Sequence, residues 1–506
     1  MVSKVLSGVL SGVTGHLVEV EADISKGLPM FDIVGLPGSS VREARERVRS
    51  AIQNSGLSMP NKRITVNLAP GDMRKEGPSF DLPIAVALLV ASGIIEHEGT
   101  TDIFITGELS LDGTIRPVDG VLAMVSELPK IGIRHCIVPF ENAEEAALVD
   151  GLEVIGPRFL IELISHLCGD TPLPSAPRSG LLRQKPKPLA NLQDVRGQAV
   201  AKRALEIAAS GGHNMLMVGP PGSGKSMLAR CLPAILPEPS FEEAIEITKI
   251  HSVAGLMKGR TMLTERPFCA PHHSISYAAL VGGGRIVRPG EISLAHGGVL
   301  FLDELPEFAR NTLEMLRQPI ESGDITIHRA GSSSVTYPAS FMLLAAMNPC
   351  PCGFYGDGSD RCSCSQAEIA RYLGKVSGPL LDRIDIHIEV SPLDYSRMAA
   401  PPAGETSEEV AARVEKAGLV ARKRYGTTIR NAQLTPEQVD MFCRLGDEEN
   451  NMLRLAFENM RLSARAYHKV LKVARTIADL GGKEHIDISC IAEALQYRSL
   501  DRKYWA

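Results

Sequence analysis

Eight consecutive residues near the middle of the chain carry the clearest chemical signal. They are Gly219, Pro220, Pro221, Gly222, Ser223, Gly224, Lys225 and Ser226. Glycines at this spacing let backbone N–H groups curl around a phosphate, which the dipole of a following helix also favours. In such a loop the lysine reaches the β- and γ-phosphates, and the serine hydroxyl binds Mg²⁺. The motif predicts a site for ATP and Mg²⁺, against the alternative of a chance glycine-rich turn.

Two carboxylates, Asp303 and Glu304, directly follow the apolar stretch Val299–Leu302. Parallel strands end at one edge of a sheet, so these carboxylates should lie beside the phosphate loop. Asp303 could then hold the metal ion while Glu304 orients and polarises the attacking water. Without the loop, the same stretch could be any strand that leads into an acidic turn.

Asn348 and Arg383 are further candidates for this site. Asn348 follows the apolar stretch Phe341–Met347 and could position water or sense the γ-phosphate. The alternative is an Asx-type cap before Pro349. Arg383 lies between two aspartates, where it could form a salt bridge within the chain. It could instead be an arginine finger that reaches the nucleotide of a neighbouring subunit, which requires an oligomer.

Arg465, Lys469 and Lys472 recur at helical spacing, away from the apolar face of their helix. The three cations could form a solvated surface. Alternatively, Arg465 at the start of the helix could contact the γ-phosphate.

Four cysteines cluster as two C-x-C pairs: Cys350 with Cys352, and Cys362 with Cys364. Four thiolates in so short a loop suit a closed tetrahedral Zn²⁺ site of structural type. The alternative is a group of reduced thiols. The other six cysteines are scattered, which predicts no disulfide framework.

The composition describes an ordinary globular chain. It has 506 residues, of which 44% are hydrophobic and 22% charged, with a net charge of −5. That charge argues against a generally basic, nucleic-acid-coating protein but allows a local basic stripe. No apolar run is long enough for a membrane span, and Met1–Val13 reads as a strand rather than a signal peptide. We expect a cytoplasmic protein without a membrane partner.

The elements that must position these residues fall into several predicted domains. Residues 1–170 show helical spacing at Ser39–Ser55 and strand alternation at Ile64–Leu68, which indicates a mixed α/β domain. A proline-rich linker follows at 171–189. Residues 190–395 contain short apolar strands separated by helices, typical of a parallel α/β sheet, with the cysteine insertion at 350–364. The pattern of residues 396–506 predicts a lid made of helices.

Two segments between the predicted strands are longer than the connections that a parallel sheet requires. The first contains Pro271–Ser274, a glycine run at 282–284, and Arg285 and Arg288. The second, Asp324–Pro338, predicts a hairpin that presents His328 and Arg329. Glycines beside arginines suit a hairpin that touches nucleic-acid phosphates, whereas the alternative is an ordinary surface loop. His272 and His273 lack further ligands, which disfavours a metal site there.

The motifs resemble a known family. The phosphate loop, Gly297–Phe308, Met347–Gly353, Gly378–Val390 and Leu462–Leu480 are similar to the YifB/ComM group of magnesium-chelatase-like AAA+ proteins. The resemblance spans nearly the whole chain. It implies a ring-forming, hexameric ATPase, and the ComM branch is a DNA helicase that promotes branch migration during natural transformation. It also implies that Asn348 is the sensor-1 residue, Arg383 the arginine finger and Arg465 the sensor-2 arginine.

The N-terminal region resembles the proteolytic domain of Lon, which has a ribosomal S5 domain 2-like α+β fold. Gly77–Pro83 and Thr106–Gly120 carry this resemblance, and Ser79 falls where Lon has its nucleophile. The position that matches the Lon lysine is Met124, whose thioether cannot accept the hydroxyl proton. We therefore expect a non-proteolytic scaffold or binding module.

These observations favour a translocase that acts on branched or single-stranded DNA. The alternatives are a chelatase-type ATPase that remodels a protein partner, a Lon-related protease and a nucleotide-gated scaffold without enzymatic activity.

Overall fold

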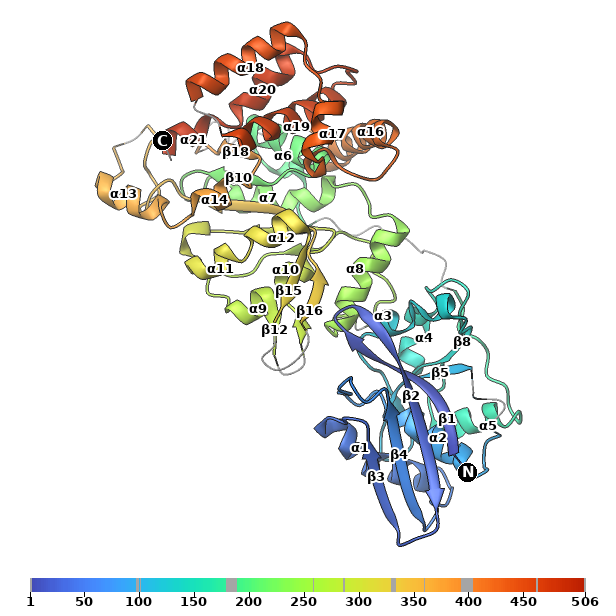
Figure 1. Cartoon of the computed structure of the whole chain (residues 1–506). Helices are drawn as coiled ribbons and strands as arrows, with labels where there is room; N and C mark the ends of the chain where they lie inside the picture. The colour runs from blue at the N-terminus through green and yellow to red at the C-terminus, as the bar shows by residue number, and fades with distance from the viewer. Residues whose placement is uncertain are drawn as a thin grey trace.

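The computed structural model describes residues 2–96, 100, 102–178, 189–257, 259–284, 287–328, 334–358, 360–392, 404–460 and 463–504. Figure 1 shows two lobes, with the N-terminal lobe below and the remainder of the chain above. Across these ranges, no helix combines the length and apolar character needed to cross a lipid bilayer.

A seven-stranded sheet forms the N-terminal lobe, in the order β3-β4-β2-β1-β5-β8-β9. The strands are β1 (Val2–Ser11), β2 (Thr14–Ser25), β3 (Met30–Val34), β4 (Arg63–Ala69), β5 (Ile103–Ile105), β8 (His135–Ile137) and β9 (Glu153–Ile155). The helices are α1 (Ser39–Asn54), α2 (Asp81–Ala91), α3 (Val121–Val125), α4 (Phe140–Ala146) and α5 (Leu160–Leu167), and β6 (Glu108–Leu109) pairs with β7 (Ile115–Arg116). Because α2 is apolar on all sides, it is buried along nearly its whole length. The negative charge of its buried Asp81 is balanced by Arg47 of α1, whose Nε lies 2.6 Å from the carboxylate.

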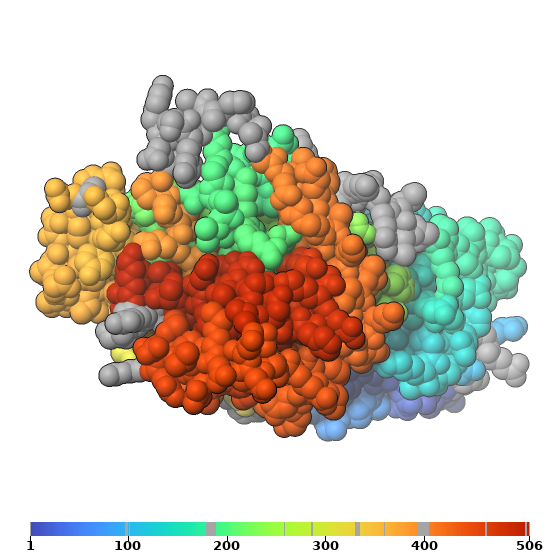
Figure 2. All heavy atoms as spheres, turned by 90° about the horizontal axis from the view of Figure 1, so that it is seen from above, coloured from blue at the N-terminus to red at the C-terminus, as the bar shows by residue number. Residues whose placement is uncertain are grey.

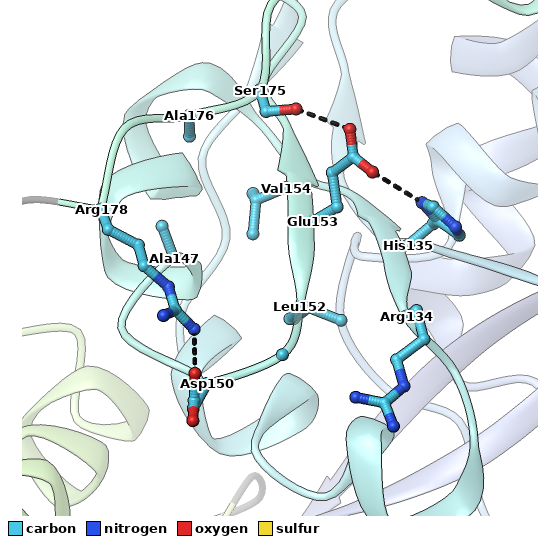
Figure 3. A pocket seen from close by; sticks show the side chains of 11 residues that line it. Arg134, His135, Ala147, Asp150, Leu152, Glu153, Val154, Ser175, Ala176 and Arg178 are labelled. Atoms are coloured by element: carbon cyan, nitrogen blue, oxygen red, sulfur yellow. Dashed lines mark hydrogen bonds and ion pairs between the residues drawn. The ribbon is translucent and has the colours of Figure 1, made fainter.

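The start of the predicted linker is attached to this lobe. Ser175 forms a β-bridge with Ile155 at the end of β9. Its hydroxyl donates to the carboxylate of Glu153 at 2.7 Å, and Arg178 pairs with Asp150 (Figure 3). Residues 171–178 therefore extend the N-terminal lobe, and the linker positions 179–188 lie outside the described residues.

The upper lobe is built on a five-stranded parallel sheet in the order β11-β14-β17-β10-β18. The strands are β10 (Met215–Val218), β11 (Phe268–Cys269), β14 (Val299–Leu302), β17 (Met342–Met347) and β18 (Ile386–Glu389). Alternate residues face opposite sides, so Met215 and Met217 join one apolar core, whereas Leu216 and Val218 join another. Burial on both faces explains why these strands are continuous apolar runs.

Helices cover both faces of this sheet. The helices of this lobe before the lid are α6 (Ala199–Gly211), α7 (Lys225–Ile235), α8 (Phe241–Val253), α9 (Tyr277–Val281), α10 (Glu291–Leu294), α11 (Arg310–Glu314), α12 (Arg317–Ser322), α13 (Gln366–Leu373), which lies at one edge, and α14 (Gly378–Leu381). Their arrangement confirms the predicted AAA+ type of α/β fold.

Both extra segments contain β-hairpins, and the two hairpins touch. The first pairs β12 (Gly282–Gly283) with β13 (Arg288–Pro289), and the second pairs β15 (Asp324–Ile327) with β16 (Val335–Pro338). The hydroxyl of Tyr337 donates to the carbonyl of Val287 at 2.8 Å. Gly282 has a φ of +105°, and a Cβ there would lie 2.8 Å from Ile327, so glycine allows the close approach. The hairpins therefore form one unit.

Among the described residues, the predicted lid contains the helices α16 (Ser407–Tyr425), α17 (Pro436–Phe442), α18 (Asp447–Met460), α19 (Ala464–Leu480), α20 (Ile488–Gln496) and α21 (Ser499–Tyr504). Side chains cap several of them, as Thr406 does for α16 and Ser463 for α19. In Figure 2 the lid covers the upper face, and the segment around residues 350–375 projects at one edge.

A buried polar network joins the lid to the sheet. Asp385, just before β18, accepts from the ammonium of Lys469 at 2.8 Å, and His213 lies 3.4 Å from the same carboxylate. His213 also contacts the hydroxyl of Thr476 on α19 at 2.8 Å. Burial by itself would raise the pKa of Asp385. The positive charge of Lys469 and the contact with His213 have the larger effect and hold this pKa well below its ordinary value. The ionised aspartate thus ties α19 to the sheet.

Candidate hydrolysis site and cysteine cluster

The phosphate loop connects β10 to the first turn of α7, as the motif predicts. Gly222 and Gly224 have φ values of +75° and +92°, which favour glycine. The ammonium of Lys225 donates to the carbonyls of Gly219 and Pro220 at 2.7 and 2.9 Å. Burial lowers the pKa of Lys225 to about 8, against the opposing effect of Asp303 and Glu304. A cation that donates to neutral oxygen atoms and is partly stripped of water is ready to accept a phosphate.

Ser226 and Asp303 face each other where the loop meets β14. The hydroxyl of Ser226 donates to Asp303 Oδ2 at 2.6 Å, and Asp303 Oδ1 accepts from the N–H of Glu304 at 3.0 Å. A hydroxyl and a carboxylate are hard oxygen donors of the kind that Mg²⁺ prefers. The donor set fits the predicted metal ion.

Glu304 has a left-handed backbone, with a φ of +53°, and its side chain contacts His273. The distance from Nδ1 of His273 to Oε2 of Glu304 is 3.2 Å. From the sequence, His273 is expected only in a segment that could touch nucleic acid or as a disfavoured metal ligand, so this contact is not predicted. The contact forms because β11 lies beside β14, and residues that follow adjacent parallel strands meet at one edge. No local pattern in the sequence specifies that adjacency.

Asn348 follows β17 and reaches the same edge. Its Oδ1 accepts from the ammonium of Lys225 at 3.2 Å. The amide therefore lies beside the lysine assigned to the γ-phosphate, as the sensor interpretation requires.

Arg383 is nearly buried, with 9% of its side chain exposed. Its guanidinium pairs with Glu321 at 2.7 Å and donates to the carbonyls of Arg317 and Pro379 at 3.2 and 2.6 Å. The salt bridge considered as the alternative to a finger is thus present in the single chain.

Arg465 lies in the first turn of α19, with 59% of its side chain exposed. It approaches Glu321 at 3.7 Å. Lys469, in contrast, is 15% exposed and bound to Asp385, and Lys472 donates to the carbonyl of Ala432 at 3.1 Å. The three cations therefore do not form a common solvated surface.

The four clustered cysteines bring their sulfurs together, and all four Sγ atoms lie within 4.8 Å of one another. The Sγ of Cys350 is 3.3 Å from that of Cys352 and 3.9 Å from that of Cys362. Zn–S bonds of about 2.3 Å in a tetrahedron put sulfurs about 3.8 Å apart, so the donor set fits Zn²⁺. A backbone hydrogen bond from Phe354 is the main cause that lowers the pKa of Cys352 to about 6, whereas burial and the neighbouring sulfurs raise the pKa of Cys362 and Cys364.

Ser79 and Met124 lie close together in the N-terminal lobe. Thr106 bridges them, since its hydroxyl donates to the carbonyl of Ser79 at 3.3 Å and lies 4.0 Å from the sulfur of Met124. The spare lysine of this region, Lys130, is 73% exposed and paired with Glu127. Neither Met124 nor Lys130 offers Ser79 a base.

The hairpin residues are described only in part. Arg288 donates to Asp119 of the N-terminal lobe at 3.2 Å, whereas His328 ends the described part of the second hairpin. Arg285 and Arg329 lie outside the described residues.

Three protein-family models match the chain, and all describe one magnesium chelatase subunit. Subunit ChlI of Mg-chelatase matches residues 20–142, and magnesium chelatase, subunit ChlI, matches residues 191–398. Magnesium chelatase, subunit ChlI C-terminal, matches residues 404–498.

Individual relatives cover nearly the whole chain. Competence protein ComM of Haemophilus influenzae is 44% identical over 502 residues, which is 98% of this chain and 97% of that protein. The uncharacterized protein YifB of Escherichia coli is 44% identical over 498 residues, covering 97% and 96%. Lon protease 2 of Bacillus subtilis is 25% identical over 182 residues, 32% of each protein.

These matches confirm the resemblance inferred from the motifs, and they agree with the phosphate loop and the parallel sheet. The chain therefore belongs to the YifB/ComM family of magnesium-chelatase-like AAA+ ATPases.

Proposed function

We propose that this chain is one subunit of a hexameric, ATP-driven DNA translocase. It would act in the cytoplasm on single-stranded or branched DNA and promote branch migration during recombination in natural transformation. The name of the 44% identical relative, a competence protein, supports this direction.

In this proposal, ATP is hydrolysed at the edge of the parallel sheet. The N–H groups of the loop and Lys225 bind the phosphates, Glu304 accepts a proton from the attacking water, and Asn348 orients that water. Ser226 and Asp303 would hold Mg²⁺, which when bound stabilises negative charge on the phosphates. Arg383 of the adjacent subunit would complete the site, since a guanidinium suits developing phosphoryl charge.

The joined hairpins are the observation that carries the DNA part of the proposal. They are additions that the parallel sheet does not need, and they connect directly to the hydrolysis site. His273, which contacts Glu304, lies four residues before α9, and α9 leads into β12. His328 would provide a polar group for phosphate oxygens, and Arg288 would provide a cationic one when it leaves Asp119.

The cysteine cluster is proposed to bind one structural Zn²⁺. It begins two residues after Asn348 and packs against the C-terminal helix, where Tyr355 contacts Tyr504 ring to edge at 6.4 Å. Four protein thiolates leave no open coordination position, so a catalytic role for this metal is not expected.

The test compares ATPase rates of the full-length protein with single-stranded, forked and four-way DNA and with casein. DNA should raise the rate, with branched substrates the most effective, and the increase should shrink at higher salt. Stimulation by casein together with peptide release would favour the Lon-related alternative. Stimulation by neither would favour remodelling of a specific protein partner.

A further inference from the structure

One carboxylate, Glu321, contacts both Arg383, the proposed arginine finger, and Arg465, the proposed γ-phosphate contact. Its Oε1 lies 2.7 Å from Nη2 of Arg383 and 3.7 Å from Nη2 of Arg465. The arginines come from different elements, one from the turn after α14 and the other from the first turn of α19. Two guanidinium groups repel each other at this range, so the carboxylate between them stabilises the arrangement.

Among the described residues, two of the three groups that the Arg383 side chain contacts belong to helix α12. Besides the ion pair with Glu321, Nε of Arg383 donates to the carbonyl of Arg317, at the other end of α12. The third contact, from Nη1, goes to Pro379. Arg383 therefore cannot extend toward a neighbouring subunit unless it leaves α12.

The same helix leads directly into the second hairpin. Glu321 is followed by Ser322, by Gly323 with a φ of +74° and by β15, which starts at Asp324. The hydroxyl of Ser322 donates to the carboxylate of Asp324 at 2.7 Å, which fixes the end of the helix to the start of the strand. A displacement of the hairpin would consequently move Glu321.

We propose that Glu321 is a positioning residue that couples the second hairpin to ATP hydrolysis. It holds Arg383 and Arg465 in the resting subunit. Substrate bound to the hairpin moves α12 and frees both guanidinium groups to pair with phosphate, that of Arg383 on the neighbouring subunit. This coupling deepens the proposed function and depends on its claim that hydrolysis occurs between subunits.

The experiment uses full-length Glu321→Gln, with Glu314→Gln as the matched control. Glu314 is a nearby acid that pairs with Arg317 at 2.6 Å and contacts neither Arg383 nor Arg465 through a hydrogen bond or ion pair among the described residues. ATPase rates are measured with and without forked DNA. We expect Glu321→Gln to raise the basal kcat by about fivefold and to bring the ratio of stimulated to basal rate close to one. Glu314→Gln should keep the wild-type ratio.

Two further variants separate coupling from structural damage. Adding Arg383→Ala to Glu321→Gln should abolish the gain in basal rate, because the gain requires a freed arginine. If Glu321→Gln does not fold, Glu321→Asp shortens the side chain while keeping its charge, and it should shift the ratio in the same direction by less.

The outcomes distinguish this inference from the proposed function. A wild-type protein that ignores every DNA would refute the DNA substrate, yet the basal rate of Glu321→Gln would still test the coupling. A DNA-stimulated wild type with the same basal rate and ratio in Glu321→Gln would overturn the coupling alone. A folded Glu321→Gln protein that loses basal and stimulated rates in parallel would overturn it as well.

Discussion

Ser226 and Asp303 are 77 positions apart in the chain, yet the Oγ of the serine lies 2.6 Å from Oδ2 of the aspartate. The contact forms because β10 and β14 both border β17 in one parallel sheet, which brings their carboxyl ends to one edge. The proposed hydrolysis chemistry depends on side chains that leave the sheet at this edge.

Replacing Glu304 by Gln should stop turnover but preserve ATP binding. The amide keeps the size of the side chain and cannot accept the proton of the attacking water, so kcat should fall by about a hundredfold or more. Steady-state ATPase and a fluorescent-nucleotide binding assay measure the two effects. Glu307→Gln, which changes an exposed acid three residues away, is the control. Undiminished hydrolysis in Glu304→Gln would refute its assignment as the base.

Two inactive variants should restore each other when mixed. Arg383→Ala removes the finger but keeps the phosphate loop, whereas Glu304→Gln keeps the finger. In a mixed ring, some interfaces join an intact Glu304 to an intact Arg383 of the next subunit, so activity should return. The ATPase rate is measured across mixing ratios. A rate that never exceeds the sum of the separate variants would show that Arg383 acts within its own chain.

Zinc should be present at about one ion per chain and be lost from Cys352→Ser, because a structural site needs all four thiolates. Elemental analysis of the purified protein measures the content. Cys168→Ser is the control, since Cys168 is an exposed cysteine outside the cluster. Folded wild-type protein without zinc would count against the metal site.

Ser79→Ala should leave the ATPase rate unchanged, because Ser79 lies in the N-terminal lobe, away from the proposed hydrolysis site. Neither Met124 nor Lys130 can act as a base for the Ser79 hydroxyl, so this residue is not expected to cleave peptides. Neither the wild type nor the variant should release peptides from labelled casein. Peptide release by the wild type that disappears in Ser79→Ala would restore the protease interpretation.

Asp385→Asn should destabilise the junction between lid and sheet, by about 3–5 kcal/mol, because it leaves Lys469 buried without its counter-ion. The pKa of Asp385 is depressed in the folded state, so its contribution is present above the unfolded pKa of about 3.9 and is lost as the pH falls further. Thermal unfolding of both proteins should show a large difference in Tm at pH 7. The difference should shrink below about pH 4. An equal Tm at pH 7 would contradict the proposed role of the network.

The sequence by itself determined the parts of the site that depend on short stretches of chain. The phosphate loop, the strand at Val299–Leu302 and the helix at Ser407–Tyr425 have the predicted bounds. The cysteines also come together as their spacing predicts. In each case neighbouring residues impose the geometry, through glycine torsions, apolar periodicity or the shortness of a loop.

Only the tertiary structure decided which distant side chains meet. His273 contacts Glu304 because β11 and β14 are adjacent, an order that no local pattern specifies. Lys469 shares a helix face with Arg465 by periodicity, yet one is buried against Asp385 and the other is largely exposed. Periodicity defines a face of a helix but not what packs against it. The meeting of Arg383 and Arg465 at Glu321 likewise depends on how the lid, α12 and the turn after α14 pack together.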